Sequence, residues 1–178
     1  MPSHKLPFDL GPSKLVARFG QEIAATTRGP IVDVACGYGR NACYIASFGA
    51  PVICVDIDED ALRSVSQLRT KSKLVLLRLD LEKDPWPFEP ESLGAILSVD
   101  FFRAALLDHF ISSLAVGGCM LIETIEGRGE NYRELPPAGL IQGRLADRFE
   151  VFFCKERKVG PHDINAATMK LFAYKRRP

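Results

Sequence analysis

The residues best suited to chemistry are two glycines and an acid, which follow apolar runs. Residues 31–36 are apolar apart from one aspartate, and they lead into a turn that contains Gly37 and Gly39. Glycine has no Cβ, so such a turn lets the backbone pass close to a ligand, and the helix start behind it offers unpaired N–H groups. A second apolar run, residues 52–55, ends in Asp56, where a carboxylate suits the two hydroxyls of a ribose. The pattern predicts a nucleoside-containing ligand.

The same turn also fits the fingerprint of a dinucleotide-binding domain. It reads G-x-G-x-x-A from Gly37, and Asp56 follows at about the expected distance. Three features favour a different nucleoside cofactor. Asp33 lies inside the first apolar run, where a buried carboxylate needs partners, and Asp80 ends the third run, where it can accept a hydrogen bond from an adenine amino group. The chain also leaves no room for a second domain to hold a hydride acceptor. A nicotinamide-dependent oxidoreductase and a non-catalytic cofactor-binding module remain the alternatives.

Length and composition narrow the class of protein. The 178 residues, 47% hydrophobic and 25% charged, suit a single domain over residues 1–178. A net charge of +1 gives no electrostatic argument for nucleic acid or membranes as partners. Five cysteines without CxxC spacing indicate reduced, mostly buried thiols, and the three scattered histidines predict no metal site. With no signal-peptide core and no apolar run of about 20 residues, we expect a cytoplasmic protein.

The elements that must position these residues alternate along the chain. Residues 1–27 form an N-terminal segment whose helix, 11–27, packs on the sheet or caps the site. Strands are predicted at 31–36, 52–56, 74–79, 93–99 and 119–125, and helices at 40–48, 58–70 and 102–114. Each strand is a continuous apolar run, which is typical of strands covered on both faces.

The last third of the chain departs from this alternation. Residues 127–139 are polar and irregular, and residues 140–147 suit one short helix. Strands at 149–155 and 167–174 lack a crossover helix between them, so they must pair antiparallel. The pattern predicts an α/β fold, a parallel sheet with an antiparallel hairpin at one edge.

These motifs carry a family resemblance. The run VDVACGYGRN, residues 32–41, resembles the first motif of the class I S-adenosylmethionine-dependent methyltransferases, and its Gly-Arg-Asn ending is similar to the small bacterial branch with tellurite-resistance-type enzymes. Similar motifs follow at residues 55–58, 79–81, 97–100 and 117–124. The resemblance implies a three-layer Rossmann-like fold, whose seven-stranded, mostly parallel sheet ends in an antiparallel C-terminal hairpin. It also implies S-adenosyl-L-methionine as cofactor and methyl transfer to a small-molecule acceptor by in-line displacement.

The resemblance also implies roles for individual residues. Asp33 orients the methionine end of the cofactor, Asp56 binds the ribose, and Asp80 holds the adenine edge. The full cofactor-binding set is Asp33, Ala35, Cys36, Gly37, Gly39, Asn41, Asp56, Ile57, Asp80, Leu81, Ser98 and Val99. The chain departs from one version of the family pattern because Cys36 follows Ala35 rather than a glycine. We expect Gly39→Val to fill the cofactor's space while the fold survives.

The acceptor side has several candidate residues. Since the leaving group departs neutral, the protein mainly aligns the acceptor and excludes water, and a base is optional. If the acceptor must lose a proton, the candidate bases are, in order, Asp100, Glu123, Tyr132 and His162. Phe101 and Phe102 either line the acceptor pocket or pack in the core. Both prolines of the Asn/Asp-Pro-Pro-aromatic motif are absent after Asp100, so we infer no methylation of a nucleobase or glutamine.

Residues 127–139 are a candidate lid over the acceptor. Unstructured loops of about 13 residues tend to cover active sites or to be disordered, and glycines at both ends suit a hinge. Arg128, Asn131, Tyr132 and Arg133 in this loop favour a small anionic or polarisable acceptor. A surface loop without function is the alternative. The identity of the acceptor stays open, and the oligomeric state is a monomer or a homodimer.

Overall fold

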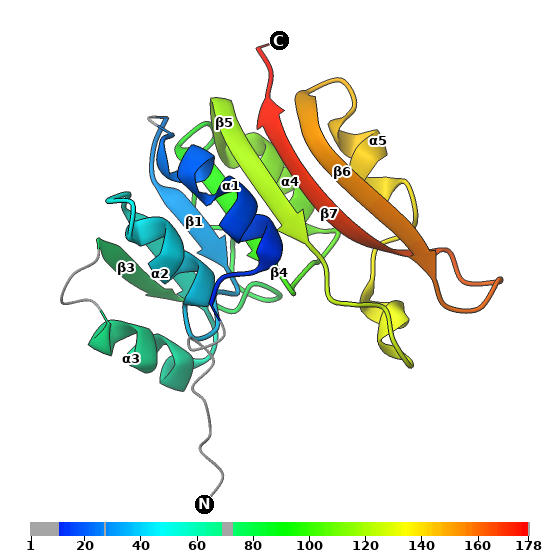
Figure 1. Cartoon of the computed structure of the whole chain (residues 1–178), viewed down its shortest axis with the longest axis horizontal. Coiled ribbons are helices and arrows are strands. Elements are labelled where there is room, and N and C mark those ends of the chain that lie inside the picture. Colours follow the sequence, from blue (N-terminus) through cyan, green and yellow to red (C-terminus); the bar gives the residue numbers. More distant parts are fainter. Residues whose placement is uncertain (1–10, 27, 69–72, 178) are drawn as a thin grey trace, which may run out of the picture.

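One seven-stranded sheet organises the molecule (Figure 1). A computed structural model describes residues 11–26, 28–68 and 73–177. The strand order is β3-β2-β1-β4-β5-β7-β6. The strands are β1 (Ile31–Val34), β2 (Val52–Asp56), β3 (Leu74–Arg78), β4 (Leu93–Val99), β5 (Leu114–Glu123), β6 (Phe149–Val159) and β7 (Ala166–Lys175). The first five are parallel, and β7 pairs antiparallel with both β5 and β6. The predicted mostly parallel sheet with an antiparallel C-terminal hairpin is confirmed.

Helices cover both faces of the sheet, which makes three layers. One core cluster joins the sheet to α1 (Lys14–Ala24), α2 (Arg40–Ala46) and α3 (Glu59–Gln67). The other joins it to α4 (Leu106–Ser113) and α5 (Leu140–Leu145). Figure 1 shows α1 and α2 in front of the sheet, with α4 and α5 behind it. None of the helices in the described ranges is long and apolar enough to cross a membrane.

Side-chain caps explain where two of the helices start. The Ser13 hydroxyl accepts a hydrogen bond from the Val16 N–H, so α1 begins three residues later than the predicted 11–27 helix. The Asp58 carboxylate accepts from Asp60 and Ala61 at the start of α3. The expected segment 1–10, residue 27, and the end of the predicted 58–70 helix lie outside the described residues.

The connection from β3 to β4 contains no helix. Residues 79–92 cross the sheet face as a loop, and Trp86 fills the place that a helix would take. Its ring lies 5.1 Å from that of Phe88 and 5.3 Å from that of Phe110, and its indole N–H donates to Ser113 Oγ at 3.3 Å. Aromatic side chains thus bury this face of the sheet without regular structure.

Two further expectations need correction. The helix predicted at 102–114 begins only at Leu106. A buried Ser98 hydroxyl donates to the Phe101 carbonyl at 2.6 Å and holds the chain in a turn before it. The prediction that every strand is covered on both faces is wrong for β3, where Val75 is 56% exposed, because β3 forms the edge of the sheet.

Candidate functional site

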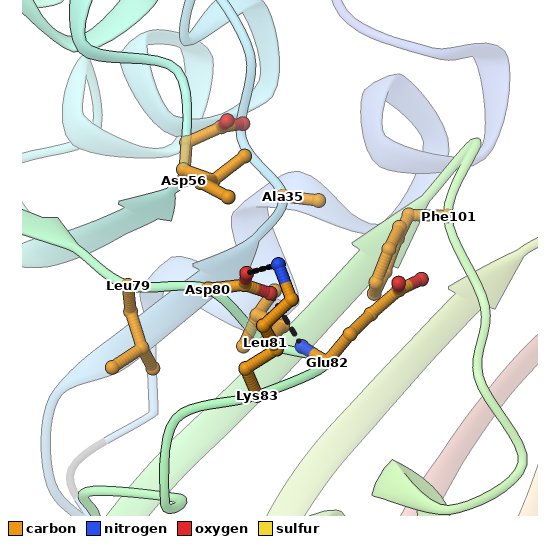
Figure 2. A pocket seen from close by; sticks show the side chains of 9 residues that line it. Ala35, Asp56, Leu79, Asp80, Leu81, Glu82, Lys83 and Phe101 are labelled. Carbon is orange, nitrogen blue, oxygen red and sulfur yellow. Dashed lines mark hydrogen bonds and ion pairs between the residues drawn. The ribbon is translucent and has the colours of Figure 1, made fainter.

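Two cavities meet at the carboxyl ends of the central parallel strands. The first, of about 240 Å³, lies between β2, the chain after β3, and Phe101 (Figure 2). The second, of about 370 Å³, lies between the turn after β1 and the end of β4. Ala35 lines both, so the two cavities adjoin, and we call them together the groove. The expected cofactor-binding residues that line this groove are Ala35, Cys36, Gly37, Asn41, Asp56, Ile57, Asp80, Leu81 and Val99.

The two glycines of the turn are required for different structural reasons. Gly37 has φ +52°, lines the second cavity, and a Cβ built on it meets no atom within 4 Å. Gly39 has φ +76°, and its Cβ would lie 2.8 Å from Val65 Cγ2 on α3. Only Gly37 therefore leaves room at the groove. The expectation that a side chain at Gly39 would fill the ligand's space and spare the fold is wrong, because that side chain would collide with α3.

Asp56 ties β2 to the glycine turn. One carboxylate oxygen accepts the Gly37 N–H at 2.7 Å, and the other accepts the Asp58 N–H at 2.9 Å. A carboxylate offers about four lone-pair sites, so two acceptor sites remain for ligand hydroxyls. Asp56 can therefore both shape the turn and bind a ribose.

The rest of the first cavity suits a flat, apolar group with a polar edge. Ile57 is 53% exposed, and Leu79, Leu81 and Phe101 supply further apolar surface. Asp80 lies on the floor, where its carboxylate accepts from Lys83 Nζ at 2.9 Å and from the Glu82 N–H at 3.0 Å, as Figure 2 shows. These hydrogen bonds lower the pKa of Asp80, Lys83 being the largest cause.

Besides Gly39, two expected residues, Asp33 and Ser98, do not line the groove. Asp33 is buried and accepts the Ala42 N–H at 3.0 Å. Burial raises its pKa to about 7, although the Ala42 hydrogen bond and Arg40 oppose the rise. Ser98 is fully buried and holds the turn after β4. Both support the site through the backbone that they fix.

Non-glycine residues with positive φ mark the ends of both central strands. Ala35 has φ +52° after β1, and Asp100 has φ +57° after β4. Such backbone costs energy and tends to occur at functional sites. Residue 35 thus has glycine-like geometry without being a glycine. The backbone at Asp100 is fixed by a hydrogen bond, in which the Asp100 N–H donates to the Glu123 carbonyl at 2.8 Å.

Arg40 is a groove residue that the sequence reasoning did not select. It begins α2, lines the second cavity, and its guanidinium contacts Asp100 Oδ2 at 2.8 Å. Its place in the Gly-Arg-Asn run was the available signal. The next residue, Asn41, accepts the Ser13 N–H at 2.9 Å and so joins the start of α1 to the turn.

A third cavity, of about 100 Å³, opens on the other side of Asp100. Asp100 also lines the second cavity and Phe101 the first, so this space adjoins the groove. Its other walls are Phe102, Arg103, Thr124, Ile125, Glu134 and Leu135. Phe101 and Phe102 both line this cavity, and Phe102 is in addition buried in the core.

The candidate lid is more ordered than an irregular loop. It contains the 3-10 helix η3 (Asn131–Glu134), and Pro137 forms an isolated bridge with Ala166. Tyr132 lines none of the cavities around the groove; its ring lies against Gly160, on the turn between β6 and β7. Arg128 is paired with Glu126.

The candidate bases are therefore not equivalent. Asp100 lies at the junction of the second and third cavities. Glu123 ends the neighbouring strand β5. His162 lies on the exposed turn between β6 and β7, two residues after Gly160, which the Tyr132 ring contacts. The structure thus brings Asp100 and Glu123 together, and leaves Tyr132 and His162 on the hairpin side.

The pKa of Asp100 is raised by its partly buried position. Burial is the largest cause, and the carboxylates of Glu123 and Glu126 add to it, whereas Arg40 and Lys170 oppose it. A carboxyl group with a raised pKa is better suited to accept a proton near neutral pH than an ordinary one. The arrangement can therefore bind a nucleoside in the groove and present a carboxylate to a second molecule in the third cavity.

Comparisons with known proteins agree with this geometry. A family model described as a methyltransferase domain matches residues 32–114. A structure solved in work on the conversion of a disulfide bond into a thioacetal group during echinomycin biosynthesis is 16% identical, with a TM-score of 0.67 over 97% of this chain and 85% of that chain. TehB from Haemophilus influenzae is 16% identical, with a TM-score of 0.65 over 90% of this chain but only 61% of its own. A proposed S-adenosylmethionine-dependent methyltransferase from Listeria monocytogenes is 13% identical, with a TM-score of 0.67 over 92% and 99% of the two chains. No curated protein sequence matches this chain significantly.

Proposed function

We propose that this chain, a class I S-adenosylmethionine-dependent methyltransferase, transfers the methyl group to a small-molecule acceptor bound in the third cavity. The observation that carries the proposal is the junction at Asp100, where the long groove meets a cavity of only about 100 Å³. A groove of this length suits the cofactor, and the small cavity beside it suits a compact acceptor.

The residues of the groove fit the cofactor. A side chain at Gly37 would take up the open space beside the turn, which glycine leaves for the ligand. Asp56 keeps free lone pairs. The apolar walls near Ile57 suit an adenine. When bound, S-adenosylmethionine supplies a methyl group on a positively charged sulfur. Asp56 would hold the ribose, Asp80 the adenine edge, and the turn at Gly37 the methionine part, with Arg40 beside it.

The other residues position the acceptor. Asp100 lies between the two bound molecules and can take a proton from the acceptor. Phe101, Phe102 and Leu135 exclude water around it, which favours an in-line displacement that depends on alignment. Because Glu134 and Leu135 come from residues 127–139, we retain that segment as a lid, with η3 as its ordered part.

Partners and location belong to the same proposal. A net charge of +1 supports a small molecule over a nucleic acid, and one structural neighbour comes from the biosynthesis of echinomycin. We place the protein in the cytoplasm, which its five free cysteines support, as a monomer or a homodimer.

The first test is cofactor binding. Isothermal titration should show binding of S-adenosylmethionine and of its demethylated product, and no binding of NAD or NADP. Binding of the nicotinamide cofactor alone would revive the oxidoreductase alternative. Binding without turnover on any acceptor would favour the non-catalytic module.

The lid is tested by a loop exchange. Replacing residues 128–133 by a Gly/Ser linker should leave cofactor affinity unchanged, since no residue of this segment lines the long groove. It should abolish turnover of the acceptor. Full turnover after the exchange would show that the segment has no role.

A further inference from the structure

We propose that the acceptor is a free α-amino acid, whose carboxylate and ammonium groups are bound by Arg133 and Glu134 while its reactive side chain reaches Asp100. This inference rests on the proposed methyl transfer and names the chemical class of its acceptor. It concerns a fourth cavity, which lies beside the third and which the proposed function does not use.

The fourth cavity, of about 270 Å³, extends the space that is open to the acceptor. None of its residues lines the groove, and the residues that it shares with the third cavity are Phe102, Arg103, Glu134 and Leu135. Ligand pockets usually have volumes of about 300–1,000 Å³. The third cavity alone, at about 100 Å³, does not reach this range, whereas the two together do. An acceptor that enters the third cavity can therefore extend into the fourth.

The charged side chains of the fourth cavity differ in the partners that they already have. Arg103 is held in place, because its Nε donates to Glu82 Oε1 at 2.5 Å and its Nη1 donates to the Phe102 carbonyl at 3.0 Å. Arg133 and Glu134 are exposed, and within the described ranges neither side chain has an ion pair or a hydrogen bond. Neighbouring residues of η3 thus present one free guanidinium and one free carboxylate to the same cavity.

These charges balance, which decides what kind of ligand they suit. Glu82 neutralises Arg103, and Arg133 and Glu134 carry one charge of each sign. A cavity without net charge favours neither an anion nor a cation as a whole, but it can bind both kinds of group at separate points. A guanidinium binds a carboxylate through two parallel hydrogen bonds, and a carboxylate accepts from an ammonium group. A free α-amino acid carries both groups on one carbon atom and has no net charge, so it matches this pair.

The expectation of an anionic acceptor rests on Arg133 alone. The other polar residues of the segment on which it depended, Arg128, Asn131 and Tyr132, line neither the third nor the fourth cavity. Because Glu134 offsets the charge of Arg133, the acceptor that fits has a carboxylate without being an anion overall.

The positions of the two carboxylates orient the acceptor. Asp100 lines the second and third cavities, and Glu134 lines the third and fourth, so they mark the two ends of the third cavity. An amino acid whose ammonium group is held at Glu134 therefore directs its side chain through the third cavity towards Asp100. Phe102 and Leu135 give this passage apolar walls, and its volume of about 100 Å³ limits the side chain to a few atoms.

The chemical step takes place on the side chain and balances without a further reactant. A thiol, hydroxyl, imidazole or amine uses a lone pair to form a bond to the methyl carbon. The carbon–sulfur bond breaks, and its electron pair stays on the sulfur, which becomes neutral. The attacking atom releases one proton, which Asp100 accepts. The α-carboxylate and the α-ammonium group are unchanged.

The test compares forms of one acceptor that differ in a single group. Wild-type enzyme with S-adenosylmethionine is assayed for release of S-adenosylhomocysteine with cysteine, homocysteine, serine, threonine, tyrosine, histidine, lysine and ornithine. The best substrate is then compared with its decarboxylated form, its deaminated form and its two dipeptides with glycine. We expect kcat/KM for the free amino acid to be about 10-fold or more above that of each derivative, the effect of one lost hydrogen bond to a charged group. Nuclear magnetic resonance of the product should place the new methyl group on the side chain.

Three results would overturn the proposal. The first is a derivative that is turned over as well as the free amino acid or better. The second is methylation of the α-nitrogen, which would place that nitrogen at the cofactor instead of at Glu134. The third is the absence of both turnover and calorimetric binding for every amino acid in the set.

Variants connect each charged group of the acceptor to one side chain. Arg133→Gln should lower kcat/KM for the free amino acid about 10-fold, but that for the decarboxylated form less than about 2-fold. Glu134→Gln should show the same contrast with the deaminated form. The Kd of S-adenosylmethionine should stay within about 2-fold of wild type for both, since neither residue lines the groove. An equal loss for all forms of the acceptor would refute the assignment, because it would indicate a purely structural role.

Two residues of β6 provide matched controls. Arg157 and Glu150 are exposed, their side chains have no ion pair or hydrogen bond in the part of the chain that the structure describes, and they line neither the groove nor the third and fourth cavities. Arg157→Gln and Glu150→Gln should change kcat/KM less than about 2-fold. Effects equal to those of Arg133→Gln and Glu134→Gln would contradict a specific contact with the acceptor.

Two outcomes separate this inference from the proposed function. If the enzyme methylates a compound other than a free amino acid, the methyltransferase proposal stands and the amino acid inference fails. If S-adenosylmethionine does not bind, the proposed function itself fails. Unfolding curves of each variant show whether a loss of activity reflects loss of the fold.

Discussion

Asp33→Asn tests the cost of keeping a carboxyl group inside the first strand. The side chain is 1% exposed, and burial raises its pKa from 3.8 to about 7. The native state then holds the proton more tightly than the unfolded chain. The contribution of Asp33 to folding stability is therefore greatest below pH 3.8, and it is lost as the pH rises towards 7.

The magnitude follows from the two pKa values. The difference between 3.8 and about 7, at about 1.4 kcal/mol per pH unit, corresponds to about 4 kcal/mol in total. About 2.5 kcal/mol of this change in stability occurs between pH 5 and pH 8, the range in which most proteins can be measured. Asparagine carries no charge at any pH. It can still accept the Ala42 N–H, although its own buried N–H groups add a cost that does not depend on pH.

The assay is chemical denaturation of both proteins at several pH values. We expect the stability of Asp33→Asn relative to wild type to rise by about 2.5 kcal/mol from pH 5 to pH 8, whatever its value at pH 5. Asp60→Asn is the control, since Asp60 is 81% exposed, and its curve should stay nearly parallel to wild type. If Asp33→Asn is also parallel to wild type, Asp33 is not held in a desolvated site and the reasoning fails.

Three other predictions concern the glycine turn, its bond to Asp56 and the packing of the sheet. Gly39→Val should lower stability by about 2–5 kcal/mol, because of its positive φ and the clash with Val65, whereas Gly37→Ala should cost only about 1–2 kcal/mol and mainly weaken S-adenosylmethionine binding; unfolding curves and calorimetry separate the two. Asp56→Ala removes an acceptor of two backbone N–H groups, each worth about 1.5–3 kcal/mol with incomplete additivity, so both stability and cofactor affinity should fall, and a change in affinity alone would contradict its structural role. Trp86→Ala should lower stability by about 2–4 kcal/mol in urea unfolding without changing cofactor affinity, since its packing and its hydrogen bond to Ser113 lie on the face opposite to α2 and it does not line the groove.

Much of the fold is visible in the sequence because it depends on local patterns. The apolar runs before Gly37 and Asp56 predicted parallel strands, and those strands occur. Asp58 stands directly before the helix that it caps. The structure of residues 79–92 could not be predicted from local periodicity. There the packing of Trp86 takes the place of a helix between β3 and β4.

The site divides in the same way. The turn after β1 joins strand, glycines and helix start within about ten residues, so the prediction of a ligand-binding edge there could be made from the sequence alone. The hydrogen bond from Gly37 to Asp56, the packing of Gly39 against Val65, and the ion pair of Lys170 with Glu123 all link separate elements. These depend on which strands lie side by side and on where their ends converge, and the spacing of residues along a chain does not contain that information. The sequence thus predicted the strands, the turn and a nucleoside-containing ligand, whereas the tertiary structure decided which carboxylates lie near one another at the ends of β4 and β5, because pairing across the sheet brings them there.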